Sequence, residues 1–205
     1  MTYSIFIILV FSCIAFSFSP GAGAIATMSR AIDGDASKVK YNIVGLQLAL
    51  MFHLVIVTAG LGAMVASSDF AFNVIKYSGA LYLLYLGFMK IKNSDQVSYK
   101  KENVLRNKGQ SVLNGFLVNI SNPKSIVFLV AFIPQFIVGQ GGFTQYFQLG
   151  LVVLVIDTLA MFTYYSFANS LMKYLTDETQ KKRLNILFGS MFILLSILLL
   201  ISERN

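Results

Sequence analysis

Three ionisable side chains, His53, Lys124 and Asp157, lie inside hydrophobic runs of this sequence. An ionised group at bilayer depth costs a few kcal/mol, so such residues face a protein interior or a water-filled cavity. Histidine titrates near neutral pH, and a membrane carboxylate can carry a proton or hold a substrate ammonium. We therefore assign His53 and Asp157 as candidate proton-coupling residues. For His53, a structural role in which the ring bonds a backbone carbonyl is an equal alternative.

Lys124 belongs to a polar interruption of the hydrophobic run 112–138, together with Asn119, Asn122 and Pro123. The proline removes a backbone donor and breaks the helical ladder. Broken spanning helices form the substrate sites of many transporters, so we predict that these four residues bind substrate. The alternative is a kinked helix with a snorkelling lysine. Lys124 lies about 18–21 Å along a helix from either end of the run, which is beyond a lysine's reach.

A second interruption, Ser19-Pro20-Gly21, occurs near the N-terminus and is followed by Gly23. Glycines allow a helix to break and other helices to approach closely. The chain is predicted to restart as a half-helix over 24–29, whose unpaired amide donors favour an anion such as a carboxylate. We add Pro20, Gly21 and Gly23 to the predicted substrate site. A simple proline kink is the alternative.

The composition indicates an integral membrane protein built of α-helices. The chain has 205 residues, of which 56% are hydrophobic and only 12% are charged, against about 25% charged in a soluble domain. Its net charge of +7 comes mostly from short loops, so it does not indicate a nucleic-acid partner. Cys13 is the one cysteine, and the sequence contains no phosphate loop, metal-ligand cluster or nucleophile–base pair. We expect no metal, no cofactor and no enzymatic activity.

Six hydrophobic segments predict six transmembrane helices. They run over Tyr3–Met28, Val39–Ala66, Phe70–Met89, Val112–Val138, Phe143–Ala168 and Leu184–Ile201. No Lys or Arg precedes the first segment, so we interpret it as a retained span rather than a signal peptide. Tyr164 and Tyr165 are interpreted as interface aromatics, and Gly45 with Ala49 as small-residue helix packing.

The loops predict the orientation. Basic residues gather in the odd-numbered loops: Arg30, Lys38 and Lys40 in the first; Lys92, Lys100, Lys101, Arg106 and Lys108 in the third; Lys173, Lys181, Lys182 and Arg183 in the fifth. Odd-numbered loops are therefore predicted to be cytoplasmic. If the first segment does not span, the N-terminus moves to the cytoplasm and the later spans keep their orientation.

The single domain 1–205 is predicted to contain two related halves, 1–91 and 110–205, joined by a basic cytoplasmic loop over 92–109. A proline interrupts the first span of each half. His53 follows Pro20 by 33 residues, and Asp157 follows Pro123 by 34. Three spans per half insert with opposite orientation, which is the inverted-repeat plan of secondary transporters.

The chain resembles the LysE/RhtB (lysine exporter-type, homoserine/threonine exporter-type) translocators. The resemblance rests on Pro20-Gly21-Ala22, Ser29-Arg30, the stretch 79–87 (Gly-Ala-Leu-Tyr-Leu-Leu-Tyr-Leu-Gly) and, most specifically, the stretch 115–124 that ends in Asn122-Pro123-Lys124. It implies an exporter of amino acids or close relatives in the bacterial inner membrane, driven by the proton-motive force.

Two departures from the family pattern stand out. Many members have Pro-Gly-Pro where this chain has Pro20-Gly21-Ala22, and Gly-Asp where Ala49-Leu50 stands before His53. The expected partners are a small amino-acid-like substrate and membrane lipid, and a homodimer is left open. The alternative function is an intramembrane enzyme or an accessory membrane subunit. A channel is less well supported, because isolated Lys, His and Asp residues do not form charged rings.

Overall fold

The computed structural model describes residues 3–32, 36–61, 68–92, 107–137 and 143–201, and these residues form helices joined by short connections. The long elements are α1 (Tyr3–Phe18), α2 (Ala22–Ile32), α3 (Ala36–Ile56), α5 (Asp69–Lys92), α6 (Lys108–Ile120), α7 (Pro123–Phe132), α8 (Phe143–Ser166), α9 (Ala168–Thr176) and α10 (Glu178–Ile201). A π-helical turn, Val57–Leu61, extends α3, and a 3-10 turn, Ile133–Phe136, extends α7.

The predicted six spans correspond to four straight helices and two bent pairs. Among the described residues, α3, α5, α8 and α10 are each long and apolar enough to cross a membrane. The pair α1–α2 bends by 51° and the pair α6–α7 by 57°, each at a break of at most four residues. Counting each pair as one span gives six, and the predicted breaks in the first and fourth spans are confirmed.

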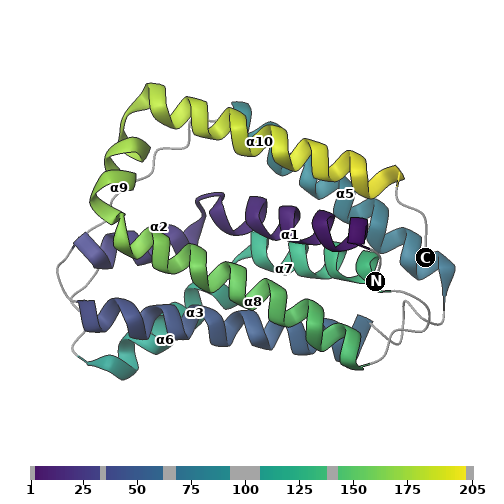
Figure 1. Cartoon of the computed structure of the whole chain (residues 1–205), viewed down its shortest axis with the longest axis horizontal. Coiled ribbons are helices and arrows are strands. Elements are labelled where there is room, and N and C mark those ends of the chain that lie inside the picture. Colours follow the sequence, from purple (N-terminus) through teal and green to yellow (C-terminus); the bar gives the residue numbers. More distant parts are fainter. Residues whose placement is uncertain (1–2, 33–35, 62–67, 93–106, 138–142, 202–205) are drawn as a thin grey trace.

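The spans are arranged in three rows, and one half of each bent pair, α1 and α7, lies in the middle row (Figure 1). α5 and α10 pack together along one side, and α3 and α6 along the other, with α8 crossing against α1, α2 and α3. In the middle row, the Phe16 and Phe128 rings stack with their centroids 4.2 Å apart, and Phe132 and Phe136 continue the stack.

Glycines allow close contact between α3 and α6. A Cβ atom at Gly45 of α3 would overlap the backbone carbonyl of Val112 in α6, and one at Gly115 of α6 would overlap the carbonyl of Asn42 in α3. The absence of side chains at both positions lets the two backbones touch, as small residues do between membrane helices. The predicted packing role of Gly45 is confirmed.

The structure differs from the sequence prediction at two helices. α9 was expected to be loop, but its nine residues bury Ala168, Met172 and Leu175 on one face, against α2. The spacing of these residues is helical, but the helix is too short to cross a membrane. A search for membrane spans therefore does not find it. The last span also begins earlier than expected, at Glu178 instead of Leu184. Most of the third loop (93–106) and the fourth loop (139–142) lie outside the described residues.

Candidate functional site

The break between α6 and α7 satisfies its backbone amides with its own residues. Asn122 is the N-cap of α7: its side-chain oxygen accepts a hydrogen bond from the Lys124 amide at 3.1 Å, and Pro123 occupies the first helical turn. The amides of Ser125 and Ile126 donate to the Asn122 carbonyl. Asparagine at the N-cap and proline just after it are strongly preferred at helix starts, so the local sequence explains this break.

The break between α1 and α2 depends on other helices. The last carbonyls of a helix have no partner within it. Here the Lys124 ammonium of α7 donates to the carbonyls of Phe16 and Ser19, both at 2.6 Å. The Tyr164 hydroxyl of α8 donates to the Phe18 carbonyl at 2.6 Å, and the Lys90 ammonium of α5 donates to the Pro20 carbonyl at 3.0 Å. Donors from three separate helices therefore hold the end of α1.

The start of α2 has free donors. The amides of Ala22, Gly23 and Ala24 make no hydrogen bond among the described residues; the first paired amide is that of Ile25, which donates to the Gly21 carbonyl. Lys124 also passes this end, because a Cβ atom at Gly21 would lie 3.7 Å from its Nζ atom. Free amides beside an ammonium form an environment that favours an anion.

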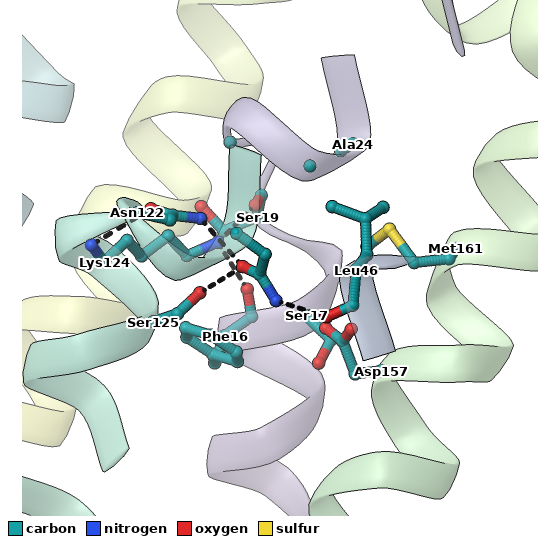
Figure 2. Close-up of a pocket in the computed structure, with 13 residues that line it drawn as sticks. Phe16, Ser17, Ser19, Ala24, Leu46, Asn122, Lys124, Ser125, Asp157 and Met161 are labelled. Atoms are coloured by element: carbon teal, nitrogen blue, oxygen red, sulfur yellow. Dashed lines mark hydrogen bonds between the residues drawn. The ribbon is translucent and has the colours of Figure 1, made fainter. Parts of the chain in front are cut away.

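A carboxylate lies on the opposite side of the same space. Asp157 of α8 is buried and accepts a hydrogen bond from the Gln47 side chain of α3 at 2.9 Å. The Ser17 hydroxyl lies beside it (Figure 2). The Ser19 hydroxyl is only 1% exposed and has no hydrogen-bond partner among the described residues. Buried polar groups are normally paired, so an unpaired hydroxyl here is consistent with a ligand position.

These groups surround one small cavity between the two helix breaks. Its volume is about 30 Å³, while a single water needs about 10–15 Å³. It is lined by Phe16, Ser17, Ser19, Gly21, Gly23, Ala24, Leu46, Asn119, Asn122, Lys124, Ser125, Asp157 and Met161 (Figure 2). The space holds two or three waters but not an amino acid, so the conformation described here is closed.

The structure brings together six of the predicted site residues: Gly21, Gly23, Asn119, Asn122, Lys124 and Asp157 all line the cavity. Asn119 ties its walls together, because its amide donates to the Leu46 carbonyl at 2.8 Å and its side-chain oxygen accepts from the Ser125 hydroxyl at 2.8 Å. Pro20 and Pro123 contribute the breaks rather than lining atoms. The Lys124 ammonium is bonded inside the protein, as predicted from its depth.

Two predicted residues lie differently from the expectation. His53 does not line the cavity; its Nε2 atom lies 3.2 Å from the Ile120 carbonyl at the end of α6. This contact is the structural alternative that the sequence left open. The interpretation of Tyr164 as an interface aromatic is wrong. Its side chain is 4% exposed because its hydroxyl is needed inside the protein to satisfy the Phe18 carbonyl.

Sequence reasoning missed several residues of the site. Lys90, Gln47, Ser17 and Ser125 were not singled out, nor were the apolar lining residues Leu46 and Met161. Ser19 was noted only as part of the first interruption. Gln47 carried a usable signal, because it is an amide within the hydrophobic run of α3. Lys90 ends a span, where a basic residue is ordinarily explained by topology, and the serines are too common in membrane helices to stand out.

The fold and the cavity are those of a helical membrane protein with a closed polar site at its broken spans. Comparison with known proteins gives the family. The family model described as LysE type translocator matches residues 14–203, so the chain belongs to this family. The resemblance seen in the sequence is confirmed.

Three relatives illustrate the family. The homoserine/homoserine lactone efflux protein of Salmonella typhi is 35% identical over 200 residues, which cover 97% of each chain. An uncharacterized membrane protein of Vibrio cholerae is 34% identical over 194 residues, covering 94% of this chain and 95% of that protein. The threonine efflux protein of Escherichia coli is 25% identical over 149 residues, covering 71% of this chain and 72% of that protein. No solved structure matches the chain significantly.

Proposed function

We propose that this protein exports a small amino acid across the bacterial inner membrane as a secondary transporter, by proton antiport. The observation that carries the proposal is the cavity between the two helix breaks, where free amides and an ammonium face a buried carboxylate. An amino acid presents the complementary pair of charges. The names of the relatives, which are efflux proteins for homoserine, homoserine lactone and threonine, support the same substrate class.

The carboxylate of the substrate binds at the start of α2. The amides of Ala22, Gly23 and Ala24 donate to it, and Lys124 neutralises its charge. To do so, the ammonium leaves the carbonyls of Phe16 and Ser19, which it occupies in the closed conformation. A dehydrated carboxylate needs this compensation, because burying an unpaired charge costs far more than its hydrogen bonds return.

The ammonium of the substrate binds on the Asp157 side, where Ser17 and the released carbonyls at the end of α1 supply further acceptors. Carbonyl groups at a helix C-terminus carry partial negative charge and favour a cation. Substrate and Lys124 therefore compete for the same carbonyls. Binding the substrate frees Lys124 for the carboxylate, so occupancy of the site is coupled to a change at the break of the first span.

We assign the coupling proton to Asp157. A carboxylate in a closed membrane site is costly when ionised and unpaired, so it takes up a proton when the substrate ammonium leaves. During the antiport cycle, the substrate ammonium and the proton therefore neutralise Asp157 in turn. His53 lies outside the lining of the cavity and stays a second candidate, whose contact with the Ile120 carbonyl supports a role in holding the end of α6.

The experiment uses purified protein in proteoliposomes loaded with radiolabelled L-homoserine. With an imposed proton gradient, the parent protein should drive homoserine movement, and the recovered solute should be chemically unchanged. Asp157→Asn should remain folded but lose both gradient-driven movement and homoserine counterflow, because the neutral amide mimics the proton-loaded state, which does not hold the substrate ammonium. Full gradient-driven movement by Asp157→Asn would exclude Asp157 as the coupling residue, and a modified solute would indicate an enzyme.

The direction of transport requires an orientation. We propose that the odd-numbered loops face the cytoplasm, on the strength of their basic residues. Single cysteines placed in the loop 92–108, in a Cys13→Ala background, should resist impermeant thiol reagents in intact cells and react after the membrane is opened. Ready labelling of intact cells would reverse the orientation.

We also propose that the two halves of the chain are structurally related. The proposed inverted repeat of 1–91 and 110–205 is supported by the two bent pairs, α1–α2 and α6–α7, which occupy the same place in each half. The second span of each half also carries an ionisable residue that meets the end of the other half's first half-helix: His53 contacts Ile120 of α6, and Asp157 lies beside Ser17 of α1.

A further inference from the structure

The cavity has one apolar wall. Ala24 of α2, Leu46 of α3 and Met161 of α8 are buried and form it, while Lys124 and Asn122 lie on the other side (Figure 2). The proposed function places both charged groups of the substrate among the polar atoms. The side chain of a bound amino acid must then extend toward the side chains of this wall, because these three side chains are apolar.

Leu46 is held rigidly in this wall. Its carbonyl accepts the hydrogen bond from the buried Asn119 amide at 2.8 Å, which fixes the backbone of α3 at this position. Across the cavity, a Cβ atom at Gly23 would lie only 3.3 Å from a methyl group of Leu46. The space between α2 and Leu46 is therefore no larger than about one methyl group, so a larger substrate gains little room when this side chain moves toward α2.

Met161 completes the wall with a side chain that has more rotatable bonds than that of Leu46. The Thr27 hydroxyl donates to the Gly23 carbonyl at 2.8 Å and approaches the Met161 sulfur at 3.7 Å, so the thioether rests against α2 one turn beyond the free amides. Methionine has three rotatable bonds and fills irregular gaps. Small movements of Met161 adjust the cavity, but its chain occupies the space that a longer substrate side chain would need.

We propose that Leu46 and Met161 set the upper size of the substrate side chain, so that the site accepts amino acids with small side chains and excludes those with leucine-sized or aromatic ones. This inference rests on the proposed function. An apolar wall discriminates well by size but poorly against an added hydroxyl group. The exported class therefore includes small amino acids with and without a hydroxyl group.

The test compares L-homoserine with L-leucine, both radiolabelled, in counterflow assays with proteoliposomes. The parent protein should move homoserine much faster than leucine. Met161→Ala and Leu46→Ala should each raise the ratio of leucine to homoserine initial rates by about tenfold, the effect of a few methylene groups in a hydrophobic pocket. The shift should appear mainly in the leucine rate, because homoserine already fits.

Matched controls exist on the same helix or in the same apolar cluster. Met172 of α9 is buried to a similar degree, 7% exposed against 5% for Met161, but does not line the cavity. Leu50 lies one turn beyond Leu46 on α3 and is also buried outside the lining. Met172→Ala and Leu50→Ala remove the same atoms from the protein interior and should leave the ratio unchanged.

The outcomes separate the inference from the proposed function. Homoserine counterflow by the parent protein, with an unchanged ratio in Met161→Ala and Leu46→Ala, would overturn the size limit alone. The same shift in the controls would also overturn it, because it would reflect a loosened interior. If the parent protein moves neither amino acid, the proposed function fails and the inference fails with it. Should Met161→Ala not be recovered folded, Met161→Val shortens the same side chain and should shift the ratio in the same direction.

Discussion

The two helix breaks look alike in the sequence, since each combines a proline with small or polar residues, but they are built in opposite ways. The break before α7 uses its own residues: Asn122 caps the new helix and the first amides are paired. The break before α2 has no such cap, and the described residues leave its first amides unpaired. The carbonyls at the end of α1 take donors from α5, α7 and α8.

This difference indicates that one break is fixed and the other can change during transport. A break that satisfies its own backbone can serve as a fixed platform. A break whose hydrogen bonds come from three other helices changes whenever those helices move or their donors find a better partner. The Lys124 backbone belongs to the break before α7, and its ammonium bonds the carbonyls at the break before α2. Lys124 therefore links the two breaks directly. Substitutions at Lys124, Tyr164 and Asn122 test this difference between the two breaks.

Lys124→Gln should insert normally and lose homoserine transport by on the order of 100-fold, the usual result of removing one partner from a buried charged contact. The neutral amide cannot balance a carboxylate. Lys124→Arg should recover transport only in part, because the two cations differ in shape and hydration. Initial rates in proteoliposomes, normalised to folded protein, provide the measurement.

The matched control for this variant is Lys108→Gln, at the exposed start of α6. It removes the same charge outside the cavity and should transport at the parental rate. A parental rate and apparent affinity in Lys124→Gln would remove the lysine from the site and, with it, the proposed link between the two breaks.

Tyr164→Phe tests whether the first break depends on distant donors. The change deletes the hydrogen bond to the Phe18 carbonyl and keeps the ring. An unpaired buried carbonyl costs about 1 kcal/mol or more, so we expect the transport rate to change by about fivefold while the protein remains folded. Tyr165→Phe, one residue further along α8, is the control, since its hydroxyl makes no hydrogen bond among the described residues. Equal behaviour of the two variants would show that this donor is dispensable.

Asn122→Ala tests the self-contained break and should have the smallest effect. Loss of an N-cap side chain costs about 1 kcal/mol, which for a chain of this size lowers the thermal midpoint by about 2–4 °C. Asn122→Ser, which retains an N-cap acceptor, should restore most of the loss. Asn107 caps the exposed start of α6 in the same manner, so Asn107→Ala should cost a similar amount. A far larger loss at Asn122 than at Asn107 would mean that the second break also depends on its surroundings.

The sequence was sufficient for the features that local chemistry determines. Proline and glycine predicted both breaks, and hydrophobic length predicted the spans. The position of Lys124 within its run predicted a lysine bonded inside the protein. These features follow from residues that are near one another in the chain, so their physical consequences can be worked out without the fold.

The partners of the first break could not be found in this way. A side chain that donates to a backbone carbonyl in another helix needs no particular residue at the acceptor, because every residue has a carbonyl. Tyr164 and Lys90 therefore have no recognisable counterpart in the sequence around Phe18 and Pro20. The apolar wall was hidden for a related reason, since Leu46 and Met161 are ordinary residues of hydrophobic helices until the fold places them beside charged groups.

The dependence of the first break on later helices also determines the order in which the protein can be completed during synthesis. α1 and α2 leave the ribosome before the later helices. The donors that satisfy the end of α1 follow 70 residues later for Lys90, 108 for Lys124 and 146 for Tyr164, counted from their acceptors. Until these segments arrive, several backbone carbonyls have no protein partner, and lipid offers none. The nascent first span must therefore stay near water or in contact with the insertion machinery, and its final shape is one of the last features of the protein to form.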